Sequence, residues 1–165
     1  MLVIFGGLPG VGKSTLARQL AGELGAVYLR IDTIERAIAA GNQAVSIDEK
    51  GYQVAYALAE DNLRLGHTVI GDSVNPLQIT RNAWRSAAER AAVSAMEIEV
   101  VCSDRLEHRR RIETRDADMP VTWDEVVARN YEPWIGDRIS IDTAGQEIAQ
   151  SFATLLRLVS ERMRT

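Results

Sequence analysis

A glycine-rich segment near the start of the chain has the residue types and spacing that bind a polyphosphate. Residues 7–14, Gly-Leu-Pro-Gly-Val-Gly-Lys-Ser, fit the pattern G-x-x-x-x-G-K-[ST]. Glycines let backbone N–H groups turn inward and approach phosphate oxygens closely, and a helix that begins beside them adds the positive end of its dipole. In this pattern Lys13 brings an ammonium to the β- and γ-phosphates, Ser14 a hydroxyl to Mg²⁺, and Thr15 faces the α-phosphate. The segment therefore predicts a nucleoside triphosphate site, whose contacts are Gly7, Leu8, Pro9, Gly10, Val11, Gly12, Lys13, Ser14 and Thr15.

Two acidic residues lie at the ends of apolar, strand-like segments and could assist phosphate chemistry. Asp32 follows residues 27–31, and Asp72 follows residues 68–71. Since the carboxyl ends of parallel strands line the binding crevice, both carboxylates should point towards the phosphates. Either could hold Mg²⁺ through water or accept a proton from an attacking hydroxyl. The alternative for each is an ordinary cap on the turn or helix that follows.

Arginines are concentrated in one predicted helix after the fourth apolar segment. Arg111 and Arg115 are four residues apart and share a face of that helix. A phosphoryl-transfer enzyme needs cations over the γ-phosphate, and such an arginine is worth about 10³–10⁵ in rate. We predict that both arginines are catalytic and belong to a small lid over about residues 104–122. The alternative is a solvated face whose charge is offset by neighbouring glutamates.

The elements that must position these residues follow an alternating order. Five short, apolar segments without alternation are typical of strands covered on both faces of a parallel sheet: Leu2–Gly6, Val27–Ile31, Thr68–Gly71, Ile98–Cys102 and Ile139–Ile141. Helical patterns fill the gaps, and the capping-box signatures at Ser46–Glu49 and Thr122–Glu125 each predict a helix start. The second of these helices is expected to span Val121–Trp134. The alternation predicts one three-layer α/β/α domain over residues 1–165.

Composition narrows the class of protein. The chain has 165 residues, 46% of them apolar, a net charge of −4 and a single cysteine, Cys102. No apolar run is long enough to span a membrane, and no Cys/His group has zinc-ligand spacing. The pI of about 5.3 argues against general nucleic-acid binding, which needs a cationic surface. Residues 1–5 lack a basic export region and are better interpreted as a first strand, so we expect a cytoplasmic protein.

A second motif points to a different function. Residues 142–147, Asp-Thr-Ala-Gly-Gln-Glu, spell the switch sequence of small GTPases, in which Gln146 would orient an attacking water. In those proteins the motif follows the strand beside the phosphate loop, whereas here it follows the last strand. The chain also has no Asn-Lys-x-Asp segment to recognise guanine. We interpret the match as coincidental.

Taken in order, these motifs resemble the small P-loop kinases of the AAA type. The most similar groups are the chloramphenicol phosphotransferase and zeta-toxin-like kinases, with gluconate kinase more distant. Residues 30–35 look like the strand-two motif of chloramphenicol phosphotransferase, whose aspartate deprotonates the acceptor, a role that would fall to Asp32. Residues 69–73 look like the third strand, adjacent to the phosphate loop in a five-stranded parallel sheet of order 2-3-1-4-5. Residues 111–115 match the R-x-x-x-R of the lid helix.

The resemblance implies an ATP- and Mg²⁺-dependent kinase that phosphorylates a hydroxyl of a small molecule. The loop after the last strand would run beneath adenine, so Thr143, Ala144 and Gly145 are expected at the base. Ser14 and Asp72 are the expected metal contacts. The residues expected at the acceptor are Asp32, Arg36, Asp72 and Asn75. Aromatic candidates are Tyr52, Tyr56, Trp84, Tyr131 and Trp134, and for each of these the alternative is packing in the core. No second aspartate follows two residues after Asp32, so a shikimate-like acceptor is not expected.

Two alternatives stay open at this point. In one, the acceptor is a nucleoside monophosphate whose phosphate binds Arg36 and Arg81. In the other, the chain is a nucleotide-dependent switch or ATPase without an acceptor.

Overall fold

The computed structural model describes residues 1–41, 50–115 and 121–164, and its centre is a parallel sheet. The sheet has five strands in the order β2-β3-β1-β4-β5, and every neighbouring pair is parallel. Both findings confirm the predicted fold class. The strands are β1 (Leu2–Gly6), β2 (Val27–Arg30), β3 (Val69–Asp72), β4 (Ala95–Val101) and β5 (Ile139–Asp142).

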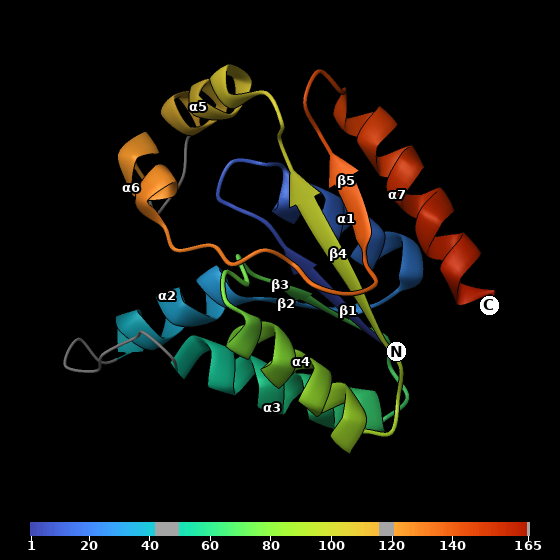
Figure 1. Cartoon of the computed structure of the whole chain (residues 1–165). Helices are drawn as coiled ribbons and strands as arrows, with labels where there is room; N and C mark the ends of the chain where they lie inside the picture. Colours follow the sequence, from blue (N-terminus) through green and yellow to red (C-terminus); the bar gives the residue numbers. More distant parts are fainter. Residues whose placement is uncertain (42–49, 116–120, 165) are drawn as a thin grey trace.

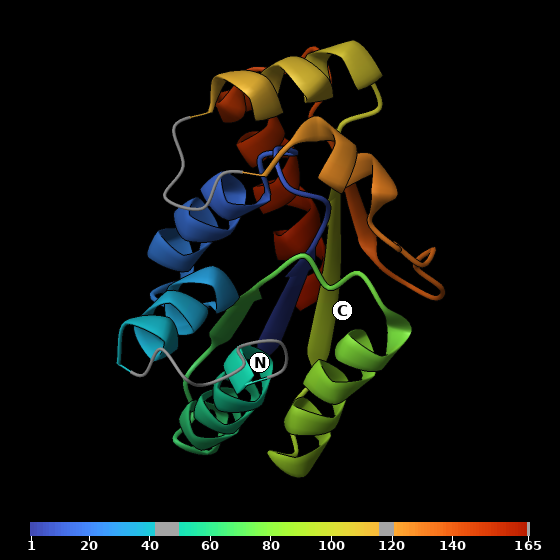
Figure 2. The same cartoon turned by 90° about the vertical axis from the view of Figure 1, so that its left-hand side faces the viewer.

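Helices cover both faces of this sheet, which gives three layers (Figure 1). The described helices are α1 (Lys13–Leu24), α2 (Ile31–Gly41), α3 (Lys50–Arg64), α4 (Gln78–Arg90), α5 (Arg105–Thr114), α6 (Trp123–Ala128) and α7 (Ile148–Met163). Helices α1 and α7 pack together on one face, while α3 and α4 pack on the other, with α2 against α3. Helices α5 and α6 lie beyond the end of the sheet towards which the strands point (Figure 2).

The central strand β1 shows why its sequence does not alternate between polar and apolar residues. Its residues 2–5 are all completely buried. Val3 and Phe5 belong to the core cluster under α1 and α7, whereas Leu2 and Ile4 belong to the cluster under α3 and α4. Because each face of β1 is covered by helices, apolar residues are needed on both. The phosphate-loop sequence follows directly after this buried strand.

Several boundaries differ from the sequence prediction. Strand β4 begins three residues earlier than expected. Strand β2 ends at Arg30, one residue earlier than expected, so Asp32 lies in the first turn of α2. The Thr122–Glu125 capping box is confirmed, but the helix ends at Ala128 instead of reaching residue 134. The predicted capping box at 46–49 and the lid residues 116–120 lie outside the described residues.

The helix after Thr122 is short because the residues that follow it are required elsewhere. Buried Arg81 on α4 donates hydrogen bonds to the backbone oxygens of Glu132 and Pro133, and Pro76 O accepts one from the Glu132 N–H. These contacts hold the segment after α6 in an extended path along α4. Continuing the helix would remove those oxygens from Arg81, which is 1% exposed. Tertiary contacts therefore decide where α6 ends.

Among the helices that the structure describes, none combines the length with the apolar character needed to cross a membrane.

Candidate active site

The loop between β1 and α1 has a backbone that glycine alone adopts easily. Gly7, Gly10 and Gly12 have φ values of 141°, 85° and 90°, all in the left-handed region. A Cβ on Gly10 would lie 2.6 Å from Cδ1 of Ile112 on α5, and one on Gly7 would lie 2.2 Å from the Val100 carbonyl oxygen. The glycines therefore serve both the conformation of the loop and its close contact with β4 and the lid. Helix α1 begins at Lys13, so its N-terminal end faces the loop.

Lys13 forms a buried ion pair inside the loop. Its ammonium donates a hydrogen bond to Oδ1 of Asp72 at 2.7 Å, and the side chains are 9% and 0% exposed. The Tyr28 hydroxyl donates to the other carboxylate oxygen at 2.5 Å. Burial alone would raise the pKa of Asp72, but the Lys13 charge and the hydrogen bonds from Lys13, Tyr28 and Ser14 together hold that pKa below its ordinary value. Asp72 is therefore a carboxylate at neutral pH.

The residues beside Lys13 fit a magnesium ion of the kind that accompanies a triphosphate. Oγ of Ser14 lies 3.4 Å from Nζ of Lys13 and close enough to Asp72 to lower its pKa. Within the described residues, no group of three or more His, Cys, Asp or Glu could hold a metal by itself. Mg²⁺ in such sites takes one or two protein oxygens and completes its shell with phosphate oxygens and water. One hydroxyl and one ionised carboxylate match that requirement.

Asp32 lies where two cavities meet. The phosphate cavity, about 310 Å³ in volume, is lined by the loop residues 8–10 and 12–15 together with Arg30, Arg115 and Arg129 among others. A second cavity of about 470 Å³, here called the acceptor cavity, lies towards α3 and α4 and is lined by Tyr52 and Tyr56 among others. Asp32 and Glu35 on α2, Val74 and Arg129 line both. A group bound in the acceptor cavity can thus reach the phosphates at Asp32.

Arg30 connects the two aspartates of the site. Its guanidinium lies 2.7 Å from Oδ2 of Asp32 and 3.9 Å from Oδ2 of Asp72. Asp32 is much the more accessible carboxylate, with 43% of its side chain exposed against 0% for Asp72. The accessible acid suits proton transfer to and from an acceptor, and the buried acid suits support of the metal and Lys13. The structure thus distinguishes by burial two carboxylates to which the sequence gave the same possible roles.

A third cavity, about 240 Å³ in volume, lies on the opposite side of the loop and is here called the base cavity. It is lined by Gly10, Gly12, Thr15, Leu16, Arg111, Thr143, Gln146, Ile148 and Ser151. The Thr143 hydroxyl lies 2.9 Å from the Val11 carbonyl oxygen and donates to it, so the loop after β5 is joined to the phosphate loop. Arg111 donates to Thr143 Oγ1 and O at 2.8 and 2.9 Å.

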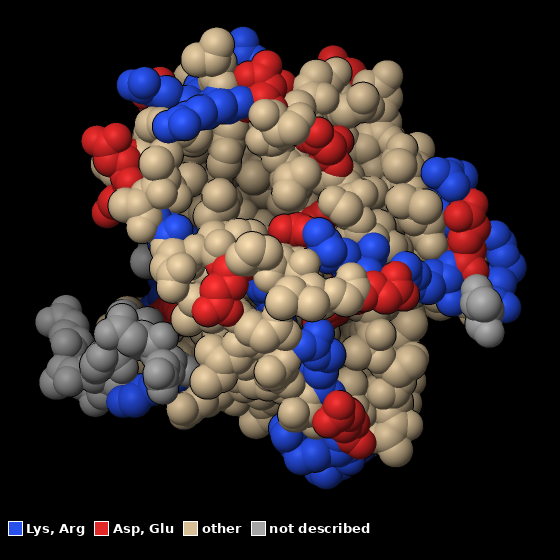
Figure 3. All heavy atoms as spheres, viewed as in Figure 1, with Lys and Arg blue, Asp and Glu red and all other residues tan. Residues whose placement is uncertain are grey.

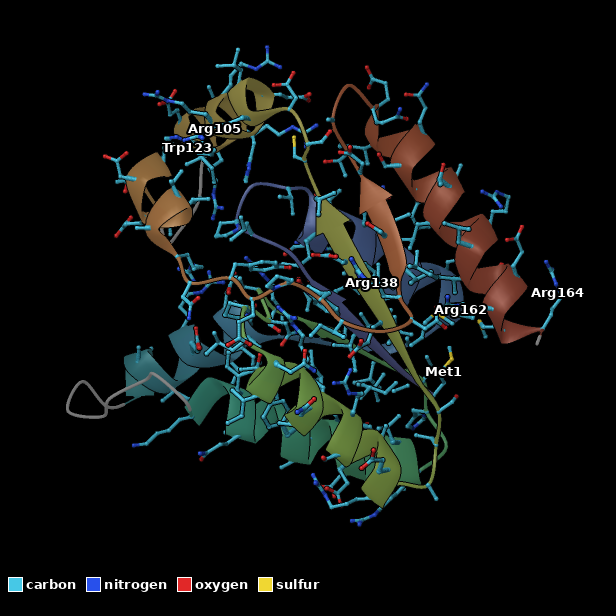
Figure 4. The ribbon with its side chains drawn as sticks, in the orientation of Figure 1. Met1, Arg105, Trp123, Arg138, Arg162 and Arg164 are labelled. Atoms are coloured by element: carbon cyan, nitrogen blue, oxygen red, sulfur yellow. The ribbon has the colours of Figure 1, made fainter. Side chains whose placement is uncertain are left out.

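Helix α5 is attached to both the phosphate loop and the loop after β5. Glu107 on α5 pairs with Arg111 at 2.6 Å and also accepts the N–H of Gly145 at 2.8 Å. Nε2 of His108 lies 2.7 Å from the Pro9 carbonyl oxygen and donates to it. Helix α6 is held to α5 by Trp123, whose ring meets the His108 ring edge-on. The guanidinium carbon of Arg105 lies 5.8 Å from the centre of the Trp123 ring (Figure 4).

The two predicted lid arginines are divided between two cavities. Arg111 lies at the base cavity with its guanidinium bound to Glu107 and Thr143, whereas Arg115 lines the phosphate cavity. The structure therefore places Arg111 at the base cavity and not among the residues that line the phosphate cavity. The outer face of α5 is solvated, with arginine side chains beside acidic ones (Figure 3), as in the exposed Arg109–Glu113 pair.

The switch-like hexapeptide also lies on the base side. Asp142 ends β5, and its carboxylate accepts the N–H groups of Ser103 and Ala144, which shapes the turn. Gln146 lines the base cavity and is not among the residues around the phosphate cavity. Gln146 is thus poorly placed to orient a water at a γ-phosphate, and the interpretation of this motif as coincidental agrees with the structure.

Several expected acceptor residues have structural positions instead. The Asn75 side chain is completely buried, donates to the Phe5 carbonyl oxygen at 2.7 Å and accepts Trp84 Nε1–H at 3.1 Å. Trp84 is itself completely buried, and Trp134, 5% exposed, lies 4.4 Å from the Arg81 guanidinium. The polar groups of Asn75 thus serve the core and not an acceptor, and Trp84 and Trp134 take the core packing that is the alternative for the aromatic candidates.

The remaining candidates are placed as follows. Tyr52 and Tyr56 line the acceptor cavity as expected. Burial raises the pKa of both hydroxyls, so they stay protonated donors. Tyr131 lines a different cavity beside α5 and α6, where burial raises its pKa to about 12. Arg36 is half-buried one turn after Asp32 on α2 and does not line the acceptor cavity.

Three residues that the sequence analysis assigned no role are part of the site. Tyr28 and Arg30 reach Asp72 because β2 pairs with β3 in a register that places Arg30 opposite Asp72. In the sequence, only the expected parallel pairing of these two strands could have indicated that Tyr28 and Arg30 contact Asp72. The third residue, Arg129, comes from the segment after α6, which the sequence analysis took for helix.

The strand order and the phosphate loop define a P-loop kinase-like fold, and comparison with solved structures agrees. A Chloroflexus aurantiacus protein is similar at a TM-score of 0.78 and 20% identity, covering 99% of this chain and 95% of that one. A sugar kinase from Janibacter sp. HTCC2649 is similar at 0.72 and 18%, covering 96% and 94%. The APS kinase from Mycobacterium tuberculosis, solved with AMPPNP and APS, is similar at 0.69 and 17%, covering 96% of each chain.

A family model described as an AAA domain matches residues 2–131. The chain therefore belongs to this family. Among curated proteins, no sequence matches. The narrower resemblance to chloramphenicol phosphotransferase and zeta-toxin-like kinases stays a prediction.

Proposed function

We propose that this protein is an ATP- and Mg²⁺-dependent kinase that transfers the γ-phosphoryl group to a hydroxyl of a small molecule. The observation that carries the proposal is the junction of two cavities at Asp32. One cavity is built on the phosphate loop, and the other is large enough for a small organic molecule. A site for hydrolysis alone needs no second cavity of this kind.

The residues suggest how the transfer proceeds. The acceptor hydroxyl oxygen attacks the γ-phosphorus, its proton passes to the Asp32 carboxylate, and the bond to the β-phosphate oxygen breaks to release ADP. Lys13 and the loop N–H groups bind the β- and γ-phosphates, and this requires Lys13 to exchange part of its contact with Asp72 for phosphate. Ser14 and Asp72 would hold Mg²⁺, which neutralises charge on the phosphate oxygens.

Thr143, Ala144 and Gly145 are proposed to bind adenine, with Arg111 beside them. The base cavity borders the loop at Gly10 and Gly12, so a base there is continuous with phosphates in the loop. Support for this orientation comes from the Thr143–Val11 hydrogen bond, which fixes the two loops relative to one another.

The lining of the acceptor cavity favours an acceptor without a negative charge. Its walls include Ile31, Val74, Pro76, Leu77, Ile79 and Ala83 beside the two tyrosines. Its charged residues are Asp32, Glu35 and a single cation, Arg129, at the junction. Because Arg30 is paired with Asp32 and the cavity has one further cation beside Glu35, its charges give no net attraction for an anion, and apolar walls do not compensate for the desolvation of an anion.

A nucleoside monophosphate acceptor is correspondingly less well supported. That alternative needed Arg36 and Arg81, but the Arg81 guanidinium binds the backbone oxygens of residues 75, 76, 132 and 133 at 2.5–3.0 Å. A buried guanidinium whose donors are used in this way is not available to a phosphate in the cavity. The second alternative, a nucleotide-dependent switch or ATPase without an acceptor, leaves the acceptor cavity without a role.

The test is phosphate transfer from [γ-³²P]ATP to a panel of neutral, cationic and anionic alcohols that includes nucleoside monophosphates. We expect transfer to a neutral or cationic member and a loss of about 10²–10⁴-fold in kcat for Asp32→Asn, with ATP affinity retained. Asp61→Asn, which changes an exposed carboxylate on α3, is the matched control and should transfer at the parent rate. Equal rates for Asp32→Asn and the parent would remove Asp32 from the chemistry. Nucleotide binding without transfer to any panel member would favour the switch alternative.

A further inference from the structure

Arg129 has a position that no other arginine of the described residues shares. It follows α6 directly and lines three cavities at once: the phosphate cavity, the acceptor cavity and one of about 360 Å³ between α5, α6 and the end of β4. Its side chain is exposed and forms no hydrogen bond or ion pair with any residue in the described part of the chain. Hydrogen bonds from Thr122 and, secondarily, the charge of Arg129 lower the pKa of Glu125, but a guanidinium at a junction of cavities whose donors bind no described protein group is available to a ligand.

The other arginines near the phosphates differ in this respect. Arg30 is paired with Asp32, and Arg111 is bound to Glu107 and Thr143 at the base cavity. Arg115 shares with Arg129 the phosphate cavity and the lack of a partner within the described residues. The cations available to a ligand are therefore Arg115, which directly follows α5, and Arg129, which directly follows α6.

The segment that carries Arg129 is fixed at both of its ends. On one side, α6 is anchored by buried Val126 and by the contact of Trp123 with His108. On the other side, Glu132 accepts the Gln78 N–H at 2.6 Å, and its backbone oxygen accepts a hydrogen bond from Arg81. The backbone at Arg129 thus connects α6 with the segment bound to α4, at the place where the phosphate cavity and the acceptor cavity meet. Such anchoring reduces the entropy lost when the guanidinium binds a ligand.

We propose that Arg129 is a catalytic residue that binds the γ-phosphoryl group during its transfer, from the acceptor side and opposite Lys13. The proposal rests on the proposed kinase function. As the acceptor oxygen–phosphorus bond forms and the bond to ADP breaks, negative charge lies on the three equatorial oxygens of the transferred group. Arg129 lines both the phosphate cavity and the acceptor cavity, so its guanidinium can contact the phosphoryl group before and after the transfer. Arg129 and the predicted lid residue Arg115, rather than Arg111, are then the cations at the γ-phosphate.

The experiment uses a probe that needs no known acceptor. Mg²⁺, ADP and aluminium fluoride together mimic the transferring phosphoryl group, so the affinity for ADP is measured by calorimetry with and without fluoride. In the parent we expect fluoride to tighten ADP binding at least about tenfold, because cations that stabilise the transition state also bind its mimic. Arg129→Ala should lose this tightening while its affinity for ADP alone stays within about twofold of the parent, since the cation acts only on the γ position.

Two further variants test whether the effect of Arg129 depends on its charge and on its position. Arg129→Lys keeps the charge but loses the planar fork, so part of the tightening should remain. Arg110→Ala removes an exposed arginine of α5 that lines none of the three cavities, and it should behave as the parent does. A merely structural role for Arg129 would lower the affinity for ADP alone or the thermal stability, neither of which is expected to move.

The outcomes distinguish this proposal from the proposed function. Full tightening in Arg129→Ala, or no tightening in the parent, would overturn the assignment of Arg129. If the parent nevertheless phosphorylates a panel alcohol, the kinase function stands without this residue. No binding of Mg·ADP by the parent would overturn both.

Discussion

Lys13→Ala should destabilise the fold as well as weaken nucleotide binding. The Lys13 ammonium is the nearest cation to a carboxylate that is completely buried, with 2.7 Å between Nζ and Oδ1. Removing one partner of a buried pair leaves an uncompensated charge and costs about 3–5 kcal/mol. Because the Tyr28 hydroxyl and the more distant Arg30 still face Asp72, we expect a loss near the lower end, about 3 kcal/mol in the free energy of unfolding.

The assay is urea unfolding of four proteins at pH 7 and pH 5. Lys50→Ala is the matched control, since it removes the only other lysine, which is exposed, and should change the free energy by less than about 0.5 kcal/mol. The double variant Lys13→Ala/Asp72→Asn removes the buried charge and should recover at least half of the loss. In that variant the oxygen of the introduced amide would still accept the hydrogen bond of the Tyr28 hydroxyl.

The pH dependence has a definite sign. In the parent, the pKa of Asp72 is held below its ordinary value of 3.8, so its contribution to stability is present above about pH 4 and is lost as the pH falls further. Without Lys13, burial dominates and raises the pKa, so the folded protein takes up a proton and gains stability as the pH falls. The difference between the parent and Lys13→Ala should therefore narrow from pH 7 to pH 5. A Lys13→Ala protein as stable as the parent at pH 7, or a gap that widens at pH 5, would refute this description of the pair.

Two other substitutions test the supports of the site. Arg81→Met should lower the free energy of unfolding by at least about 3 kcal/mol, because it removes the guanidinium that donates to four backbone oxygens. Urea unfolding measures this loss. A much smaller loss would mean that the Arg81 guanidinium is available to bind a ligand. Thr143→Val keeps the shape but removes the hydroxyl that joins the two nucleotide loops, so ATP should bind several-fold more weakly by calorimetry with about 1–3 kcal/mol lost in stability. Unchanged ATP affinity in Thr143→Val would mean that the base binds elsewhere.

The sequence predicted the features that depend on neighbouring residues. Strand β1 was found because an apolar run without alternation reports burial on both faces, and its predicted bounds agree with the structure. The phosphate loop was recognisable because its glycines and Lys13 lie within eight residues. The capping box at Thr122 is similarly local.

Features that depend on distant contacts were missed. Asn75 was expected at the acceptor, but its partner is the carbonyl of a residue 70 positions away in β1. Arg81 is satisfied in part by oxygens more than 50 positions away, and the same contacts end α6 early and leave Arg129 at the cavity junction. The difference in burial between Asp32 and Asp72 arises in the same way, because β3, which ends in Asp72, pairs with β2. No local pattern reports such contacts.

The most direct test of the central claim is a crystal structure with Mg²⁺ and AMPPNP. We expect the three phosphates inside the loop of residues 7–14, with Lys13 Nζ at the β- and γ-phosphate oxygens and adenine against Thr143. Asp32 should lie on the open side of the γ-phosphate, facing the acceptor cavity. A nucleotide bound outside this loop, or a γ-phosphate that faces away from Asp32, would contradict the assignment of this chain as a phosphotransferase.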